Sequence, residues 1–368
     1  PRGGAGGRPP TKKNPGREGA LFPGGGAGAF GRAPPLYVRL QIAPASYFLC
    51  GGGILSHSPC KLQKNMLQWQ YMEQVAVNAY GKVNFTLDVV GSADGYHLID
   101  SLVCTIDLYD RVQARPRSDG EVHVTMRGMP YVLPPEKNNA HRAAAAFVAT
   151  FGTRGADISI DKHIPVGGGL GGSSADAAGV LRALSGLFHV RDMAALKALA
   201  DGLGSDTGYL LTGGCARITG RGERVTPVSG MVPLWLLLIC PGRGVSAGAC
   251  YAQYDALGKT YPPQTGHALR LLQEEGTMSA AHLFSNALTE GAMACNGAVG
   301  RALEEARRLS PIAGMSGSGS TCYAVFENKQ ACLAARKAYR GRFRTFCVRT
   351  LPAQIHRGAL AHGRGAKE

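Results

Sequence analysis

Apolar and polar residues alternate along residues 75–90 and 98–108, and this period of two predicts a strand in each segment, with a turn at residues 91–95 between them. The alternation starts abruptly after Met72, so we expect folded protein to begin there. Shorter alternating or apolar runs bounded by turn residues predict further strands at residues 121–127, 156–160, 215–218, 233–240, 321–326 and 345–348.

Helical periodicity occurs between these strands. Residues 174–188 place apolar side chains on one face of a helix, at Ala177, Val180, Leu181, Leu184 and Leu187. Because strands and helices mix without strict βαβ alternation, the pattern favours an α+β fold over a doubly wound sheet. Further helices are predicted at residues 139–151, 193–203, 279–309 and 331–339.

The composition narrows the class of protein. Apolar residues make up 45% of the chain, which excludes disorder throughout. The sequence has no apolar run of about 18 residues or more, which argues against a membrane-spanning helix. The ten cysteines are scattered without a CxxC pair or a Cys/His cluster, which argues against a disulfide framework or a structural zinc site. We therefore expect a cytoplasmic protein with no membrane partner.

The net charge of +15 belongs to the two ends of the chain. Residues 1–71 hold nine Lys or Arg and one Glu, residues 327–368 hold ten Lys or Arg and two Glu, and the segment between them is nearly neutral. Nucleic-acid binding would require a basic face on the folded part. We therefore expect solvated, charged ends and no nucleic-acid partner.

The first 35 residues are rich in Gly, Pro and Arg and offer too little apolar surface to offset the entropy lost on ordering. We expect the whole extension, residues 1–71, to be disordered or non-native. Its Arg-rich, acid-poor character is also compatible with a transit peptide, in which case the protein would be directed to a plastid.

A glycine-rich loop, PVGGGLGGSSADAA at residues 165–178, lies between a predicted strand and a predicted helix. Glycines let backbone N–H groups converge on an anion, and the start of the following helix directs further N–H groups and its positive dipole end to the same place. The loop therefore predicts a site for the phosphates of a nucleotide, against the alternative of a tight turn without a ligand. Its candidate binding residues are Pro165, Gly167, Gly168, Gly169, Leu170, Gly171, Gly172, Ser173 and Ser174.

Two common phosphate-loop patterns fit this segment less well. A Walker A loop is excluded at Gly258-Lys259-Thr260 because Gln253 stands where its first glycine must be. Gly167, Gly169 and Gly172 satisfy GxGxxG, and Asp192 follows about 20 residues later, as in a dinucleotide-binding unit. A nicotinamide-dependent oxidoreductase therefore remains an alternative, although the loop lies deep in the chain.

Four motifs together resemble a known family. The glycine loop resembles the ATP-phosphate loop of the small-molecule kinases that include galactokinase, homoserine kinase and mevalonate kinase. Over about residues 72–350 the chain resembles the 4-diphosphocytidyl-2-C-methyl-D-erythritol kinase family in particular. Besides the glycine loop, the four motifs are the strand Asn78-Ala-Tyr-Gly-Lys82-Val-Asn84, the segment Asp94-Gly-Tyr-His97, the turn Gly204-Ser-Asp206, and the loop Gly314-Met-Ser-Gly-Ser-Gly-Ser320.

The resemblance implies a two-domain α+β kinase fold. It consists of a ribosomal-protein-S5-like domain at residues 72–227 and a ferredoxin-like α/β-sandwich domain at residues 228–350, followed by a basic tail at 351–368. ATP, with Mg²⁺, and a small-molecule substrate carrying a cytidine diphosphate group would occupy the cleft between the domains. The implied reaction is phosphorylation of the 2-hydroxyl of 4-diphosphocytidyl-2-C-methyl-D-erythritol, in the non-mevalonate isoprenoid pathway, by a monomer or weak homodimer.

The resemblance also implies roles for single residues. Asp206 would be the base and Lys82 its charge partner, because an ammonium beside the carboxylate keeps it ionised and stabilises developing charge. Tyr96 and His97 would read the cytosine, with Tyr251 covering its other face. Asn84 would contact the substrate or the Lys82–Asp206 pair, and Gly317 and Ser318 would close the phosphate end. Lys162 would either hold the nucleotide or be solvated, and no carboxylate cluster suggests a metal cage made of protein ligands alone.

Three alternatives remain open besides this kinase. A sister kinase would act on another small alcohol, of the homoserine or mevalonate type, and would have no use for a base reader at Tyr96 and His97. A non-catalytic nucleotide sensor on the same scaffold would not need both Lys82 and Asp206. The oxidoreductase would retain a nicotinamide cofactor.

Overall fold

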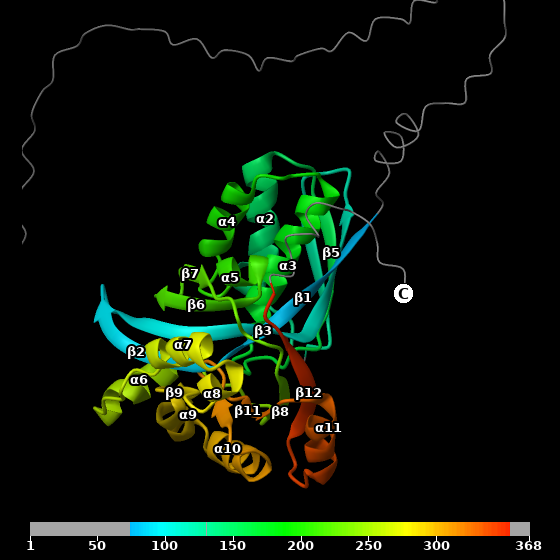
Figure 1. Ribbon diagram of the computed structural model, residues 1–368. Coiled ribbons are helices and arrows are strands. Elements are labelled where there is room, and N and C mark those ends of the chain that lie inside the picture. Colours follow the sequence, from blue (N-terminus) through cyan, green and yellow to red (C-terminus); the bar gives the residue numbers. More distant parts are fainter. Residues whose placement is uncertain (1–73, 130, 354–368) are drawn as a thin grey trace, which may run out of the picture. The chain divides into compact units, whose positions relative to one another are not determined.

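The structure is a computed structural model that describes residues 74–129 and 131–353 (Figure 1). The predicted extension and all of the predicted tail except residues 351–353 lie outside the described residues. The strands are β1 (Val75–Asn84), β2 (Thr86–Ala93), β3 (Tyr96–Pro116), β4 (Val122–Arg127), β5 (Ala156–Asp161), β6 (Cys215–Gly220), β7 (Arg224–Pro227), β8 (Trp235–Cys240), β9 (Ser285–Asn286), β10 (Ala313–Met315), β11 (Cys322–Phe326) and β12 (Arg344–Leu351). The helices are the 3₁₀ turn η1 (Pro135–Lys137), α2 (Asn139–Phe151), α3 (Gly172–Leu187), α4 (Met193–Asp201), α5 (Thr207–Thr212), α6 (Ala247–Leu257), α7 (Thr265–Glu274), α8 (Thr277–Ala281), α9 (Thr289–Cys295), α10 (Gly297–Leu309) and α11 (Lys329–Ala338).

The long strand β3 organises the sheet. It pairs with β1, β2, β5, β6 and β12, and the ordered path of the sheet runs β10-β11-β8-β12-β3-β2-β9. Strand β12 connects the two regions of the sheet, because it pairs with β8 along Arg344–Arg349 and then with β3 at Thr350 and Leu351. The sheet is therefore continuous from the first strand of the described chain to the last.

Two hydrophobic cores lie on opposite faces of β8 and β11. Leu236 and Leu238 belong to the larger core, which also contains most of α3, whereas Leu237 and Ile239 belong to the smaller core beside α9, α10 and α11. Figure 1 shows these three helices around β8 and β11, away from α2 and α4. Successive side chains of a strand point to opposite faces, so a continuous apolar run such as Trp235–Cys240 fits a strand that is buried on both sides.

Several predicted elements are confirmed. Helix α2 has the predicted bounds, and the side chain of Asn138 caps it by accepting a hydrogen bond from the backbone N–H of Ala140. Helix α3 starts two residues earlier than predicted, at Gly172. The single strand predicted at residues 75–90 is wrong, because the chain bends at Phe85, which separates β1 from β2.

The single helical segment predicted at residues 279–309 is also wrong. It is divided into α8, β9, α9 and α10. The side chain of Asn286 interrupts the helix, since its amide donates to the backbone oxygens of Met315 and Gly317 while its oxygen accepts from the N–H of Leu288. Asn296 then caps α10 by accepting from the N–H of Ala298. Asn competes with the helical hydrogen-bond pattern in this way wherever a partner lies in reach.

The helices α5, α6 and α7 were not predicted from the sequence. Helix α6 has no clear apolar face, because Cys250 is the one residue of this helix that is fully buried. Its sequence therefore shows little of the apolar periodicity that predicts a helix. Among the described residues, none of the helices has the length and apolar character needed to span a bilayer. The predicted domain boundaries at 227/228 and 350/351 stay a prediction.

Candidate active site

The glycine loop connects β5 to α3 and is held by backbone contacts from two distant segments. The N–H of Lys82 donates to the oxygen of Leu170 at 2.9 Å, and the N–H of Thr321 donates to the oxygen of Gly168 at 3.1 Å. The hydroxyl of Ser316 donates to the oxygen of Gly169 at 2.9 Å. The loop therefore lies between β1 and the 316–321 loop.

Glycine is required at two of its positions. Gly169 has φ +76°, and a Cβ there would overlap the backbone oxygen of Ser316. Gly171 has φ +72°, and a Cβ there would lie 3.1 Å from Cγ of Lys82 and 3.2 Å from Leu210. Side chains with a Cβ rarely adopt this left-handed backbone, so strain would add to the steric conflict.

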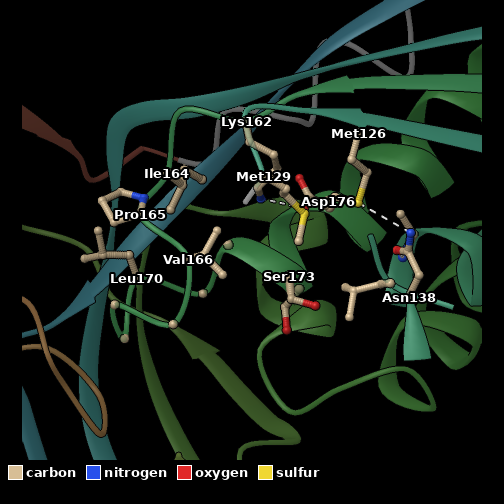
Figure 2. A pocket seen from close by; sticks show the side chains of 18 of the residues that line it. Met126, Met129, Asn138, Lys162, Ile164, Pro165, Val166, Leu170, Ser173 and Asp176 are labelled. Atoms are coloured by element: carbon tan, nitrogen blue, oxygen red, sulfur yellow. Dashed lines mark hydrogen bonds and ion pairs between the residues drawn. The ribbon is translucent and has the colours of Figure 1, made fainter. Parts of the chain in front are cut away.

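A cavity of about 310 Å³ lies along the outer side of this loop, and we call it the loop cavity (Figure 2). Its wall is mainly apolar, from Met126, Met129, Ile164 and Val166, and its floor is the loop and the start of α3. Figure 2 shows Met129, Val166 and Ser173 around the same space. An apolar chamber beside a ring of backbone amides can hold a flat ring system together with an anionic group.

A second, larger cavity of about 1640 Å³ lies on the other side of the loop, and we call it the open cavity. Gly169 and Gly171 line both cavities, so the loop separates them by the thickness of its backbone. The open cavity brings together the predicted residues Lys82, Asn84, Tyr96, His97, Asp206, Tyr251, Gly317 and Ser318.

Lys82 and Asp206 form an ion pair in the open cavity. Nζ of Lys82 lies 3.2 Å from Oδ2 of Asp206, and it donates to Oδ1 of Asn84 at 2.6 Å. Only 6% of the Lys82 side chain is exposed, so its charge needs these partners. Asn84 is itself held, because its amide donates to the hydroxyl of Ser101 at 2.8 Å. The result is a fixed cation beside a carboxylate that is 29% exposed to the cavity.

The aromatic residues of the open cavity form a cluster rather than an empty sandwich. The rings of His97 and Tyr251 stack with centroids 4.6 Å apart and an interplanar angle of 18°. Tyr96 is 59% exposed, and the guanidinium of Arg221 lies 4.5 Å from the centroid of its ring. Arg221 also pairs with Asp94 at 2.6 Å. Tyr251 thus lies against His97, whereas Tyr96 presents an exposed ring.

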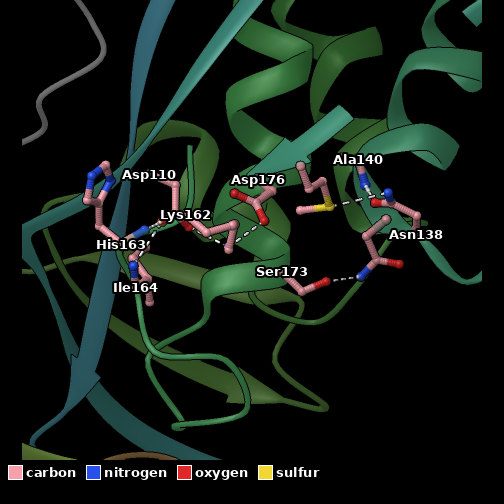
Figure 3. A network of polar contacts seen from close by, with 10 residues as sticks. Asp110, Asn138, Ala140, Lys162, His163, Ile164, Ser173 and Asp176 are labelled. Carbon is pink, nitrogen blue, oxygen red and sulfur yellow. Dashed lines mark hydrogen bonds and ion pairs between the residues drawn. The ribbon is translucent and has the colours of Figure 1, made fainter. Parts of the chain in front are cut away.

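A buried network beneath the loop was missed at the sequence level (Figure 3). Nζ of Lys162 lies 2.5 Å from Oδ2 of Asp110 and 2.6 Å from Oδ2 of Asp176, and only 5% of its side chain is exposed. Oδ1 of Asp110 accepts the backbone N–H groups of His163 and Ile164, immediately before the loop. The alternative of a solvated Lys162 is therefore wrong. The carboxylate Asp110 lies at an inward position of β3, and this is the signal that pattern reading overlooked.

The charged groups of this network shift one another's pKa values. Burial raises the pKa of the Asp176 carboxyl to about 8, and the Asp110 charge adds to the rise while Lys162 opposes it. Burial alone would lower the pKa of Lys162, but Asp176 and Asp110 outweigh it and raise that pKa above its ordinary value. The network therefore binds a proton more readily than three separate side chains would.

Metal ligation by protein side chains alone finds no support in the described part of the chain. No group of three or more His, Cys, Asp or Glu side chains in residues 74–129 and 131–353 is arranged to hold a metal ion. Ser173 and Ser174, which carry hydroxyl oxygens, line the loop cavity at the start of α3.

Comparison with known proteins places this geometry in a family. Residues 138–214 match the family GHMP kinases N terminal domain, and residues 266–344 match GHMP kinases C terminal. The chain is 32% identical over 256 residues to 4-diphosphocytidyl-2-C-methyl-D-erythritol kinase of Clostridium beijerinckii, covering 68% of this chain and 91% of that one. It is 33% identical over 289 residues to the enzyme of the same name from Brevibacillus brevis, covering 76% and 98%. The chain belongs to the 4-diphosphocytidyl-2-C-methyl-D-erythritol kinase family.

Solved structures agree with this family. The chain is similar to a crystal structure of 4-(cytidine 5'-diphospho)-2C-methyl-D-erythritol kinase with a TM-score of 0.64 and 30% identity, covering 75% of this chain and 99% of that one. It is also similar in fold to L. major mevalonate kinase, with a TM-score of 0.60 and 17% identity, covering 77% and 98%. These matches confirm the two-domain α+β kinase fold.

Family membership decides among several of the earlier alternatives. The resemblance read from the four motifs is confirmed, and the oxidoreductase alternative is wrong. Membership in a kinase family implies the use of ATP. The relatives from Clostridium beijerinckii and Brevibacillus brevis are bacterial enzymes and give no support to the plastid alternative, and the extension on which it depended lies outside the described residues.

Proposed function

We propose that this protein transfers the γ-phosphoryl group of ATP to the 2-hydroxyl of 4-diphosphocytidyl-2-C-methyl-D-erythritol, in the non-mevalonate isoprenoid precursor pathway. One observation carries the proposal. The glycine loop has a cavity on each side, and the Lys82–Asp206 pair lies in the larger one beside Gly171. Two substrates bound on either side of Gly169 and Gly171 would meet at the edge of the loop.

In this proposal the base of ATP binds in the loop cavity, which Met126, Met129 and Ile164 line. Its phosphates follow the backbone amides of the loop to the start of α3, where the free N–H groups and the dipole of a 16-residue helix favour negative charge. Gly317 and Ser318 bound the phosphate end from the 316–321 loop. A magnesium ion bound with ATP would neutralise phosphate charge, held mainly by phosphate and water oxygens, with Ser173 or Ser174 as a protein ligand.

The cytidine diphosphate end of the acceptor is placed in the open cavity. Tyr96 offers an exposed ring on which a base can stack, and His97 offers a ring nitrogen to its edge. Tyr251 supports His97 by stacking on it. Arg217 and Arg221 line the same cavity, where they pair with Asp100 and Asp94, and their guanidinium groups are the donors proposed for the diphosphate.

Asp206 then acts as the general base on the acceptor hydroxyl. Its carboxylate faces the open cavity and takes the proton as the hydroxyl oxygen attacks the γ-phosphorus, while the bond to the β-phosphate oxygen breaks and ADP leaves. Lys82, held by Asn84, supplies a fixed positive charge where negative charge develops. Positioning and charge neutralisation therefore carry most of the catalysis.

The remaining alternatives differ in what they need from the open cavity. A kinase for a homoserine-type or mevalonate-type alcohol has no need for a cavity of about 1640 Å³ or for its aromatic cluster. A nucleotide sensor has no need for a buried lysine fixed against a carboxylate. The monomer or weak homodimer stays a prediction.

The test measures ADP release by the full-length chain with Mg-ATP and, separately, 4-diphosphocytidyl-2-C-methyl-D-erythritol, homoserine and mevalonate. We expect turnover with the cytidyl substrate alone, with the new phosphorus resonance coupled to the 2-position of the product. Preferred turnover of homoserine or mevalonate would support a sister kinase. ATP binding without turnover of any of the three would support the sensor.

A further inference from the structure

One face of α6 holds the imidazole of His97 from three directions. Tyr251, Tyr254 and Asp255 are spaced i, i+3 and i+4, so their side chains lie on the same side of the helix. Tyr251 stacks on the ring, and Tyr254 meets it edge-on with centroids 6.1 Å apart and an interplanar angle of 86°. Oδ1 of Asp255 lies 2.8 Å from Nε2.

These contacts fix both the plane of the ring and its rotation. Only 21% of the His97 side chain is exposed, and the exposed part belongs to the wall of the open cavity. Within the described part of the chain, the imidazole of His97 makes one hydrogen bond, and its partner is Asp255. Nδ1 is therefore the ring nitrogen left for a ligand.

The partner at Nε2 determines what Nδ1 can do. An ionised carboxylate only accepts hydrogen bonds, so Nε2 must carry the hydrogen in the contact with Asp255. In the neutral imidazole the other nitrogen is then an acceptor, since one ring nitrogen donates and the other accepts. Carboxylates that bind the far nitrogen of a functional histidine fix its tautomer in this way.

We propose that Asp255 is a positioning residue that holds His97 in the tautomer with an accepting Nδ1, and that this selects cytosine over uracil in the acceptor substrate. The selection rests on the proposed function. The 4-amino group is the donor on the pairing edge of cytosine, whereas uracil carries an accepting oxygen at that position. An accepting Nδ1 can accept a hydrogen bond from the 4-amino group of cytosine, whereas the oxygen of uracil at that position repels it.

The structure also explains why the carboxylate comes from α6 rather than from the strand that carries His97. Asp94, three residues before His97, pairs with Arg221, and Asp100 pairs with Arg217. Both are therefore committed to arginines. Among the described residues, the ion-pair partner of Asp255 is His97. No arginine or lysine of this part of the chain lies within ion-pair distance of Asp255.

The experiment compares kcat/KM for the cytidyl substrate and for its uridyl analogue, with the full-length chain and Mg-ATP. The variants are Asp255→Asn, Asp255→Glu and the control Asp201→Asn. Asp201 also lines the open cavity, but it pairs with Lys197 and touches no histidine. Asn can donate to Nε2 and so allows the other tautomer, while Glu keeps the acceptor.

We expect Asp255→Asn to lower the cytidyl-to-uridyl ratio of kcat/KM by about tenfold or more through KM, because the donor or acceptor at position 4 is what distinguishes the two bases on this edge. Asp255→Glu should retain most of the cytidyl-to-uridyl ratio, and Asp201→Asn should leave that ratio unchanged. Asp255 is 59% exposed, so thermal unfolding should be nearly unaffected. An unchanged ratio, or an equal loss on both substrates, would overturn the proposal.

A second measurement separates this proposal from the proposed function. Nitrogen-15 NMR of histidine-labelled protein without substrate reports which ring nitrogen of His97 carries hydrogen. We expect hydrogen on Nε2 in the original chain and a shift toward Nδ1 in Asp255→Asn. Hydrogen on Nδ1 in the original chain would overturn the tautomer assignment whatever the substrate is. The expected tautomer without turnover of the cytidyl substrate would instead overturn the proposed function and the base selection that depends on it.

Discussion

Nζ of Lys82 lies 3.2 Å from Oδ2 of Asp206, although the two residues come from β1 and from the turn before α5. The glycine loop explains how this pair is held in register with the phosphate site. The backbone N–H of Lys82 donates to the oxygen of Leu170, and the side chain of Lys82 passes directly beside Gly171. The loop, the lysine and the carboxylate thus form one rigid unit.

Replacing Gly171 with Ala should therefore damage catalysis more than it damages the fold. A Cβ would lie 3.1 Å from Cγ of Lys82 in a backbone with φ +72°, so the lysine must move from the position in which it pairs with Asp206. We expect kcat to fall about threefold to tenfold, since a misplacement of about 1 Å costs a positioned group about a hundredfold and the shift required here is smaller. Steady-state kinetics measure it.

Gly266 provides the matched control for this substitution. It lies in the exposed first turn of α7 with nothing within 4 Å of an added Cβ. Gly266→Ala should leave kcat unchanged and raise the free energy of unfolding by about 0.5–1 kcal/mol. Equal kinetics for Gly171→Ala and Gly266→Ala would contradict the coupling between the loop and Lys82.

Asp176→Asn should change how stability depends on pH. Burial raises the pKa of Asp176 from 3.8 to about 8 in the folded protein, so the folded state binds a proton more tightly than the unfolded state between these values. Its contribution to stability is therefore largest below about pH 4 and is lost as the pH rises to about 8.

The measurement is urea unfolding of the original chain and the Asn variant from pH 5 to pH 8. Relative to the variant, the original chain should lose stability as the pH rises, with a slope of at most about 1.4 kcal/mol per pH unit. Asp157 is 52% exposed at an ion pair with Arg117, so Asp157→Asn serves as the control. A difference that stays constant over this range would show that Asp176 is ionised throughout.

Arg221→Ala should weaken binding of the cytidyl substrate. The guanidinium stacks on Tyr96 and pairs with Asp94, so its loss frees the ring on which the base is placed. A cation–π contact at an exposed site contributes about 0.5–1 kcal/mol, and loss of a charge near the diphosphate adds to this. We expect KM for the cytidyl substrate to rise about fivefold or more while kcat changes little.

Arg224 lines the same cavity but is 77% exposed and pairs with its neighbour Glu223. Arg224→Ala should therefore change KM less than twofold, since exposed ion pairs contribute about 0–1 kcal/mol. Both variants should unfold at the temperature of the original chain. If the two arginines affected KM equally, the effect would come from general charge and not from the contact with Tyr96.

The sequence predicts the chemistry of this protein better than the contacts between distant segments. The glycine loop, Lys82, Asp206 and His97 each lie in a short motif whose residue types indicate their proposed chemistry, so local pattern is enough to propose them. Helix α2 was also predicted correctly, because its Ala-rich run and its Asn138 cap are local signals.

The features that were missed depend on tertiary contacts. Asp110 lies on β3, Asp176 lies on α3 and Lys162 directly follows β5, so their ion pairs form only once these three elements are packed. Asp255 meets His97 across 158 residues of chain, on a helix with no clear apolar face. The break in the predicted 279–309 helix has the same origin, because Asn286 finds its backbone partners in the 315–317 segment.

The most direct test of the account is the kcat of Asp206→Asn with Mg-ATP and the cytidyl substrate, beside Asp201→Asn from the same cavity. Loss of a general base lowers kcat about 10²- to 10⁴-fold. We predict a loss in this range for Asp206→Asn with ATP affinity retained, and kcat within about threefold of the original for Asp201→Asn. Turnover by Asp206→Asn within tenfold of the original chain would contradict the assignment of Asp206 as the base.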